Sequence, residues 1–347
     1  MFAANKPRIA VTMGDPAGIG PEVIVAAWGN PSVHAQIPVV LGHPEILRRA
    51  VKLLKTRIEV TEIDGPSLQR GQWTADEQSL SCLRTSDDGV LEVLAGRVDA
   101  RAGEAAYQAV RAAAKLAIDG QVDAIVTAPL SKSALHAAGH HYPGHTELLA
   151  EMCGVKDFAM MLYLPPGDAV RAPTGLGVVH VTLHQSLRSV FDDLTTVAIV
   201  AKCRLADNAM RSLGVRRPRI AVAALNPHAG EEGLFGDEEQ SIIGPAVEAA
   251  RDAGLEVSGP FPTDTLMVRA RDGEFDAVVA MYHDQGHIAL KLLGMHAAVN
   301  VTLGLPIVRT SVAHGTAFDR AWQGTAESKG MVAAMLTAGQ LAAHRRQ

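Results

Sequence analysis

Residues 276–287 of this chain read DAVVAMYHDQGH. The first part, Asp276–Ala280, is a short apolar run rich in valine, which is typical of a buried strand. The second part places two histidines, a carboxylate and a glycine directly after that run. Strand ends join a rigid scaffold to a loop, and catalytic and metal-binding side chains often lie there. The stretch therefore predicts a buried strand that leads into a functional loop.

Two other strand-like runs end in a similar way. His184 follows the run 177–182, and His228 follows the run 220–224. Together with His283, these histidines could bind a divalent metal ion. A polar residue that could orient the ring lies close after each histidine: Gln185, Glu231 and Asp284. Because the chain has 14 histidines, three unrelated surface or capping histidines are the alternative, and the residues alone leave both interpretations open.

Apolar runs alternate with helix-like segments along most of the chain. The other expected strands are residues 9–13, 38–41, 122–127, 159–164 and 299–303, and the main expected helices are residues 21–28, 44–54, 104–118 and 327–344. This alternation predicts an α/β fold with a largely parallel sheet. Residues 65–98 are polar and irregular, which predicts a surface excursion or hairpin, and the turn-rich residues 165–175 are expected to join two strands.

The length of 347 residues exceeds what one simple core serves, so two lobes are expected. We place the boundaries between them near Ala128–Leu130 and near Pro306–Thr310. The first lobe then comprises residues 1–128 with 309–347, and the second comprises residues 129–308. The last helix is expected to pack back on the first lobe.

The charge and cysteine content exclude several classes of protein. The formal net charge is −5, and the chain has no basic stripe of the kind that nucleic-acid or membrane-surface binding requires. No apolar run reaches the roughly 18 residues of a membrane span, and the first residues contain no apolar signal core. The cysteines, Cys82, Cys153 and Cys203, are few, odd in number and far apart. They predict no disulfide framework, and a cytoplasmic location is expected.

Several polar residues could bind an anionic substrate. His145 and Thr146 begin a helix-like segment, where free N–H groups attract anions. Lys291, Asn300 and Arg309 lie on successive later elements, and arginine offers a fork of donors while lysine offers a point charge. The alternatives are a threonine cap beside an incidental histidine, a solvated lysine and a surface arginine. Arg309 follows an apolar run, however, and a charge there needs a partner, which favours a functional role.

Two loops have a glycine-rich or histidine-containing pattern. Residues 14–22 read GDPAGIGPE, between a strand and a helix. This pattern is not GxGxxG, and no Lys-Ser/Thr pair follows it, so a tight structural turn is favoured over a dinucleotide site. Residues 314–319 read HGTAFD, and from the residues alone they are a loop with a helix cap.

Taken together, these segments resemble one family. The motifs are GDPAGIGPE at 14–22, TAPLSK at 127–132, PGHTE at 143–147, NPHAGE at 226–231, YHDQG at 282–286, and RTS at 309–311 followed by HGTA at 314–317. In this order they resemble the 4-hydroxythreonine-4-phosphate dehydrogenase family of pyridoxine biosynthesis. The resemblance extends from about Arg8 to Gly324, and six ordered motifs make it specific where any one would not.

The resemblance implies an oxidoreductase that oxidises and decarboxylates its substrate with NAD (or NADP) and a divalent metal such as Zn, Co, Ni, Mg or Mn. It implies a fold similar to the isocitrate and isopropylmalate dehydrogenases, with two α/β lobes around a cleft, in a homodimer. The metal ligands, which come together at the dimer interface, would be His184, His228 and His283. The substrate contacts would be His145, Thr146, Lys291, Asn300 and Arg309. Asp264, Asp284 and Lys291 would be catalytic, with the general base left open between Asp284 and Lys291, and His314, Gly315, Thr316 and Asp319 would contact the adenosine of the cofactor.

Departures from the family pattern bear on the substrate. Ala313 stands before the HGT turn where an acidic residue is frequent, and residues 233–239, His287 and residues 291–294 look more like a sister branch. That branch is implied to oxidise 4-phospho-D-threonate or 4-phospho-D-erythronate in sugar-acid catabolism, in place of 4-hydroxythreonine 4-phosphate. The rival classes are a metal-dependent hydrolase or lyase, a phosphotransacetylase-like acyltransferase on a related fold, and a binding protein without catalysis.

Overall fold

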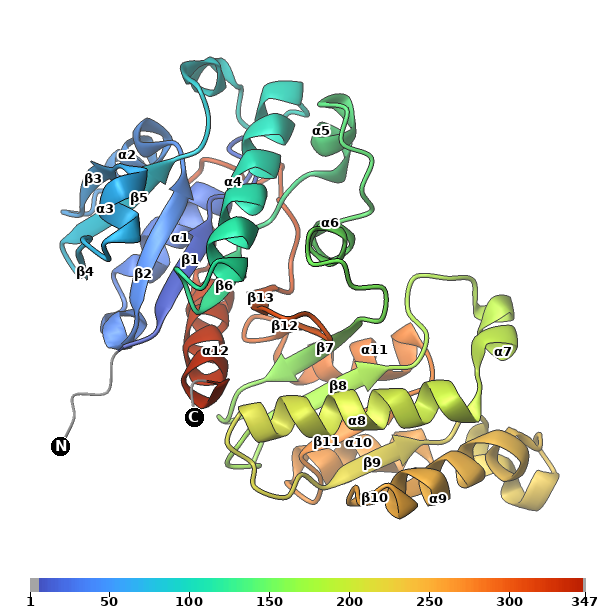
Figure 1. The fold of residues 1–347 in the computed structure, drawn as a ribbon. Helices are drawn as coiled ribbons and strands as arrows, with labels where there is room; N and C mark the ends of the chain where they lie inside the picture. Colours follow the sequence, from blue (N-terminus) through green and yellow to red (C-terminus); the bar gives the residue numbers. More distant parts are fainter. Residues whose placement is uncertain (1–5, 346–347) are drawn as a thin grey trace, which may run out of the picture. The chain divides into compact units, whose positions relative to one another are not determined.

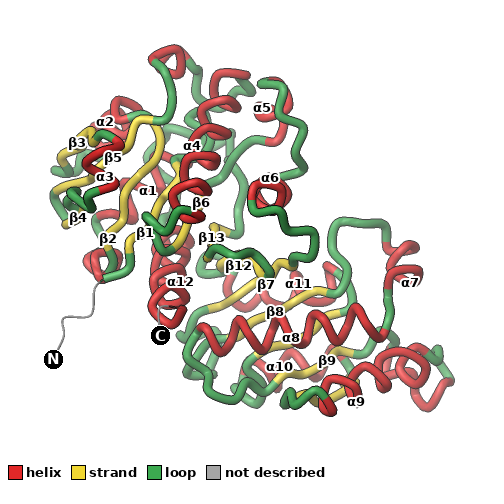
Figure 2. Tube along the Cα trace, viewed as in Figure 1, coloured by secondary structure: helices red, strands yellow, loops and turns green. Residues whose placement is uncertain are grey.

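A computed structural model describes residues 6–345 of the chain (Figures 1 and 2). The chain forms two compact units. Unit 1 contains the residues up to Phe158 together with those from Leu305 on, and unit 2 contains Ala159–Gly304. Strands and helices alternate in both units, so the predicted α/β class is confirmed.

The strands of unit 1 lie in the order β3-β5-β2-β1-β6-β13. Their bounds are β1 (Arg8–Thr12), β2 (Ile37–Gly42), β3 (Glu59–Ile63), β4 (Ala75–Asp76), β5 (Ser79–Arg84), β6 (Ala124–Thr127) and β13 (Val308–Val312). All neighbours in this order pair in parallel, and the short β4 pairs antiparallel with β5. Strands β1 and β6 are fully buried at their centres, which explains their continuous apolar sequences.

The helices of unit 1 are α1 (Gly20–Trp28), α2 (Pro44–Leu53), α3 (Gly65–Gln69), α4 (Ala100–Ile118), α5 (Lys132–Ala137), α6 (His145–Met152) and α12 (Lys329–Arg345). Helix α4 packs on β1, β2 and β6 with a face of small side chains that includes Ala109 and Ala113. Small residues allow close approach: a Cβ on Gly103 would overlap the backbone of Ala134 in α5. Helix α12 packs on β13 and β6, as expected of the last helix.

The strands of unit 2 lie in the order β10-β9-β11-β8-β7-β12. Their bounds are β7 (Ala159–Leu164), β8 (Leu176–His180), β9 (Ile220–Ala223), β10 (Val257–Phe261), β11 (Ala277–Ala280) and β12 (Val299–Leu303). The first four pair in parallel, whereas β7 pairs antiparallel with both β8 and β12. The turn-rich residues 165–175 join two strands, as predicted, and these strands are antiparallel neighbours.

The helices of unit 2 are α7 (Val190–Asp193), α8 (Thr196–Ser212), α9 (Gly244–Asp252), α10 (Thr263–Arg271) and α11 (His283–Gly294). Helix α8 lies in front of the strands and α10 and α11 lie behind them (Figure 1). Helix α11 contacts β8, β11 and β7. Within residues 6–345, we find no helix with the length and apolar character needed to cross a membrane.

The structure departs in two places from the expected organisation of the chain. The first lobe does not end near Ala128, because Leu148 and Leu149 of α6 belong to the same hydrophobic core as Ala113 and Ile125. Residues 65–98 contain a hairpin, as one of the two alternatives expected, because β4 and β5 pair antiparallel. They are more than a surface excursion, because β5 also lies between β2 and β3 in the sheet. The sequence of β5, SLSCLR, has polar residues at Ser79, Ser81 and Arg84. These residues conceal a strand whose central residue Cys82 is fully buried.

Candidate active site

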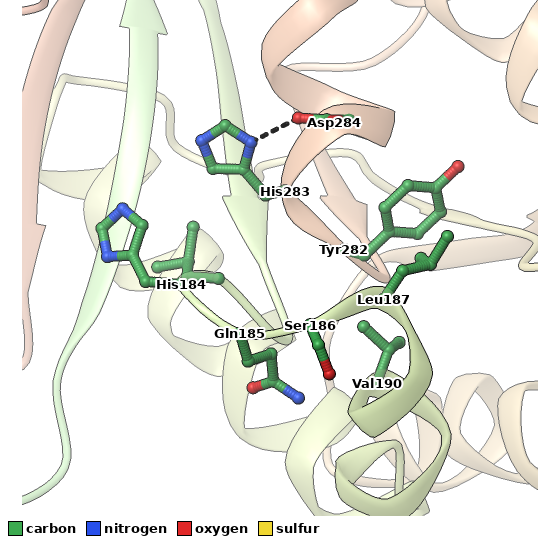
Figure 3. Close-up of a pocket in the computed structure, with 9 residues that line it drawn as sticks. His184, Gln185, Ser186, Leu187, Val190, Tyr282, His283 and Asp284 are labelled. Carbon is green, nitrogen blue, oxygen red and sulfur yellow. Dashed lines mark hydrogen bonds and ion pairs between the residues drawn. The ribbon is translucent and has the colours of Figure 1, made fainter.

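Two of the predicted metal ligands lie together in unit 2. His184 follows β8 and His283 begins α11, directly after β11, and the parallel pairing of His180 with Ala280 brings these two strand ends side by side. The ring centroids of His184 and His283 are 6.0 Å apart. Both rings border a cavity of about 590 Å³ (Figure 3). One ion with bonds of about 2 Å could contact a nitrogen of each ring after a small side-chain movement.

Asp284 orients one of these rings. Its Oδ1 lies 2.7 Å from Nδ1 of His283, as drawn by the dashed line in Figure 3. A carboxylate at Nδ1 fixes the tautomer in which the proton is on Nδ1, so Nε2 keeps its lone pair. His283 is therefore prepared to coordinate a metal ion through Nε2.

The third predicted ligand, His228, lies apart from the other two. It is exposed, and its ring centroid is 6.2 Å from that of Phe235. The backbone from His228 to Glu232 has positive φ throughout, a conformation that non-glycine residues adopt only where the surroundings impose it. The buried carboxylate of Glu239 helps to impose it, since it accepts 2.8 Å hydrogen bonds from the N–H groups of Leu225 and Asn226.

Within the described residues of the single chain, no group of three or more histidine, cysteine, aspartate or glutamate side chains has the arrangement of a metal site. The structure thus brings together His184 and His283 and leaves His228 separate. The donor set nevertheless suits a transition-metal ion, because two imidazoles with a carboxylate behind one of them are typical ligands for Zn, Co or Ni.

Helix α11 carries further predicted site residues. His283, His287 and Lys291 recur at every fourth position, so they share one face of the helix. The rings of His283 and His287 are stacked, with centroids 3.9 Å apart and planes inclined by 11°. Burial, with the charges of His283 and Lys291, lowers the pKa of His287 to about 4. His287 is therefore a neutral, buried imidazole behind the exposed site residues.

Asn300 and Asp264 come from other elements of unit 2. Asn300 is half-buried on β12, where it pairs with Leu162 of β7. Asp264 is exposed in the first turn of α10, and its Oδ1 accepts a hydrogen bond from the N–H of Thr265.

The sequence did not single out two residues that organise the site in unit 2. Gln285 accepts from the N–H of Met281 at 2.6 Å and donates to the carbonyl oxygen of Ala224 at 2.6 Å, so it ties the ends of β11 and β9 together. His180, at the end of β8, is fully buried. Burial, with the charges of His287 and His283, lowers its pKa to about 3. A histidine that ends an apolar strand run was the available signal for His180, and a glutamine beside the histidine motif was the signal for Gln285.

A second group of predicted residues lies in unit 1. Arg309, on β13, is buried, and it donates hydrogen bonds to Thr127 at 2.7 Å and to Thr146 at 3.5 Å. Burial lowers the pKa of Arg309 to about 10, and the negative charge of Glu147 partly offsets this effect. Arg309 and Thr146, both predicted to bind substrate, are thus brought together, and Thr127 is an additional contact.

His145 completes this group as the first residue of α6. Its Nε2 is buried and has no hydrogen-bond partner among the described residues. Burial, together with the charge of Arg309, holds the pKa of His145 well below its usual range. The N-cap residue, Gly144, provides no side-chain hydrogen bond to the start of the helix. A buried guanidinium beside uncapped helix N–H groups is a suitable environment for a phosphate or carboxylate.

The predicted cofactor loop follows β13 in unit 1. The carbonyl oxygen of Thr316 accepts a 3.0 Å hydrogen bond from the N–H of Ile19, and a Cβ on Gly18 would lie 3.0 Å from Thr316. The turn 14–22 therefore packs closely on this loop, as a structural turn should. Gly315 has open space around its Cα, and His314 is half-buried, so the loop has backbone accessible to a ligand. Asp319 is exposed at the end of the loop.

Comparisons with known proteins identify the family of the chain. The family model "Pyridoxal phosphate biosynthetic protein PdxA" matches residues 34–338. D-threonate 4-phosphate dehydrogenase of Salmonella typhimurium is 46% identical over 96% of this chain and 98% of its own length. 4-hydroxythreonine-4-phosphate dehydrogenase of Trichlorobacter lovleyi is 44% identical over 98% of this chain and 99% of its own length.

A solved structure extends the similarity to the fold. The crystal structure of 4-hydroxythreonine-4-phosphate dehydrogenase from Klebsiella pneumoniae is 45% identical and has a TM-score of 0.84, over 97% of this chain and 99% of that one. The relatives at this level of identity are named as dehydrogenases, which decides for an oxidoreductase over a hydrolase, a lyase or an acyltransferase. The chain belongs to the pyridoxal phosphate biosynthetic protein PdxA family, and it is an enzyme of the dehydrogenase class.

Proposed function

We propose that the protein oxidises the 3-hydroxyl of a 4-phosphorylated four-carbon acid with NAD or NADP, and that the product loses CO₂. The names of the relatives support the substrate class, since D-threonate 4-phosphate and 4-hydroxythreonine 4-phosphate are both phosphorylated hydroxy acids. The observation that carries the proposal is the buried Arg309, which lies with Thr146 and His145 at an uncapped helix start. A guanidinium beside the N–H groups of a helix start is a favourable environment for an anionic ligand.

The anionic groups of the substrate would be bound by His145, Thr146, Lys291, Asn300 and Arg309. Arg309 can donate two parallel hydrogen bonds to a phosphate or carboxylate, while the α6 N–H groups add a favourable dipole. Such contacts fix the substrate so that the hydrogen to be transferred faces the nicotinamide. In this proposal the adenosine end of the cofactor would contact His314, Gly315, Thr316 and Asp319.

A divalent metal ion would be held by His184, His228 and His283. The chemistry that such an ion supplies when bound is Lewis-acid polarisation of the substrate's hydroxyl and carbonyl oxygens. His283 contributes Nε2, because Asp284 occupies its Nδ1 side. Zn, Co or Ni suits imidazole ligands best, and Mg or Mn suits them less.

Proton transfer would fall to side chains near His283. Lys291 is two helical turns from His283 on the same face of α11, and Asp284 lies beside it. We propose these two residues as the general acid and base, with Asp264 as a further candidate catalytic residue from α10. The pH–rate profiles of the K291M and D284N variants test which of the two residues is the general acid and which is the general base.

The protein would act as a homodimer. Three apolar residues, Ile288 and Leu292 on α11 and Met295 directly after it, recur at helical spacing and are exposed, with Leu292 at 83%. An exposed apolar stripe of this kind is unusual unless another surface covers it. A second copy of the chain is the proposed partner, and its His228 would complete the metal site that one chain leaves incomplete.

The relatives do not decide the substituent at C2 of the substrate, because both names occur at nearly equal identity. We propose 4-phospho-D-threonate, or the related 4-phospho-D-erythronate, as the preferred substrate. The test is a side-by-side measurement of kcat/KM for these acids and for 4-hydroxythreonine 4-phosphate, with metal and either nicotinamide cofactor. We expect kcat/KM for 4-phospho-D-threonate or 4-phospho-D-erythronate to be at least about tenfold higher than for 4-hydroxythreonine 4-phosphate. A tenfold ratio corresponds to about 1.4 kcal/mol of activation free energy. No reduced nicotinamide with any of the three acids would exclude the proposed reaction.

A further inference from the structure

A second layer of histidines lies behind the site residues His184 and His283 of unit 2. His287 of α11 and His180 of β8 are both buried, with exposures of 5% and 0%. Nδ1 of His287 lies 3.1 Å from Nε2 of His180, so one ring donates a hydrogen bond to the other. Neither imidazole reaches the cavity that His184 and His283 line. The pair is therefore placed behind the site and not within it.

The packing of α11 is shaped around this pair. A Cβ on Gly286 would come within 2.5 Å of Nε2 of His180 and within 2.5 Å of Cγ1 of Val178. Only glycine lets the first turn of α11 lie so close to β8, and this approach brings His287 to His180. A buried imidazole pair needs this tight packing, since each ring nitrogen that faces the other would otherwise be buried without a partner.

His287 connects this buried layer to the exposed site. Its ring is stacked on the ring of His283, at 3.9 Å between centroids and 11° between planes. His283 is thus held on two sides: Asp284 contacts its Nδ1, and His287 supports its face. An unsupported imidazole would lose rotational freedom on binding an ion, and a ring that is already held loses less.

We propose that His287, held in place by His180, is a positioning residue that fixes the ring of His283 for metal binding. This inference rests on the proposed metal-dependent function. It predicts that the His180–His287 pair affects the affinity and the coordination geometry of the metal ion without contacting it. A pair with a purely structural role would affect stability alone.

The test compares H287L and the double variant H180L/H287L with the wild-type protein. H287L leaves His180 buried without its partner, and its Tm is expected to fall. The double variant removes both polar rings, so its Tm is expected to recover towards the wild-type value. H141L, which replaces an exposed histidine of unit 1, is the matched control. The two readouts are Tm and the binding of Co²⁺, followed by titration and by the visible absorption of the bound ion.

We expect H287L and H180L/H287L to bind Co²⁺ roughly 10-fold more weakly, in line with the loss of a residue that supports a metal ligand, with a changed absorption spectrum. H141L should match the wild type. Wild-type affinity and spectrum in the folded double variant would overturn the inference and leave the proposed function intact. A wild-type protein that takes up no Co²⁺, Zn²⁺, Ni²⁺, Mn²⁺ or Mg²⁺ would instead overturn the proposed metal dependence, and the positioning role with it.

Discussion

Nη2 of Arg309 donates a 2.7 Å hydrogen bond to Oγ1 of Thr127, and both side chains are buried. The register of the sheet produces this contact. Ser311 of β13 pairs with Thr127 of β6, and Arg309 lies two residues before Ser311 on the same face. The hydroxyl of Thr127 therefore faces the guanidinium of Arg309 diagonally across the two neighbouring strands. Thr127 accepts from Nη2 of Arg309, and Nη1 of the same guanidinium donates to Thr146.

The T127V variant tests whether this contact positions Arg309. Valine keeps the shape of threonine and removes the hydroxyl, so Arg309 loses one hydrogen-bond acceptor. A hydrogen bond from a charged donor contributes about 1.5–3 kcal/mol. We expect KM for the phosphorylated substrate to rise roughly 10–100-fold with a smaller change in kcat, measured by steady-state reduction of the nicotinamide. T127S, which restores the hydroxyl, should recover most of the lost affinity. An unchanged KM in T127V would show that Thr127 only fills the core.

The same strand shows why sequence patterns reveal some elements and conceal others. The bounds of β7 and β12 were predicted to the residue, because β7 is apolar along its length and β12, VNVTL, alternates apolar with polar residues. Strand β13 was missed, because its sequence VRTSV includes the functional Arg309 together with two hydroxyl residues. The three consecutive polar residues of β13 break the alternation that identifies β12, and only the pairing with β6 reveals the strand.

The candidate site was predictable in part for a related reason. His184 and His283 follow strands that are parallel neighbours, and the rule that such strand ends share one edge of a sheet brings them together. The position of His228 depends on a left-handed turn that Glu239 stabilises from more than ten residues away. His180 is buried under the site through the close approach of Gly286. Such effects of tertiary packing leave no periodic signal in a sequence.

The H228A variant tests the proposed metal ligands. Mutation of a residue that supports a metal ligand weakens metal binding by up to roughly 100-fold. Removal of a direct ligand should weaken metal binding at least as much. Activity should fall with metal content, as measured by isothermal titration with Zn²⁺ and by elemental analysis of the purified protein. H141A replaces an exposed histidine outside the set and serves as the control. Equal metal affinity in H228A and H141A would remove His228 from the ligand set.

The stability of unit 1 should depend on the ionisation of Asp15. Its side chain is fully buried, and burial raises its pKa from 3.8 to about 6. The N–H of Ala17 lowers the pKa in part, and the charge of Asp99 raises it. Between pH 3.8 and about 6 the folded state therefore binds more protons than the unfolded state. The resulting stability is present below pH 3.8 and is lost as the pH rises through about 6.

The D15N variant removes this titration. We expect the stability of D15N relative to the wild type to increase by about 1–3 kcal/mol between pH 4 and pH 8, since two pKa units correspond to roughly that range. Tryptophan fluorescence during urea unfolding is the measurement, because Trp28, Trp73 and Trp322 all lie in unit 1. D168N, at an exposed carboxylate, is the control. A difference between D15N and wild type that is constant with pH would contradict the raised pKa.

The L292E variant tests the proposed dimer and its link to the metal site. Leu292 is 83% exposed on α11, so a glutamate there costs the isolated chain little, whereas it would place a charge inside an apolar interface. We expect the wild type to sediment as a dimer and L292E to sediment as a monomer. The L292E monomer should remain folded, with an unchanged Tm. V98E, at an exposed apolar residue of unit 1, should remain dimeric.

Because His228 lies apart from His184 and His283 within one chain, monomeric L292E should also bind metal roughly 10–100-fold more weakly. Monomeric L292E with wild-type metal affinity would show that one chain completes the site by itself, through a movement of the turn that carries His228.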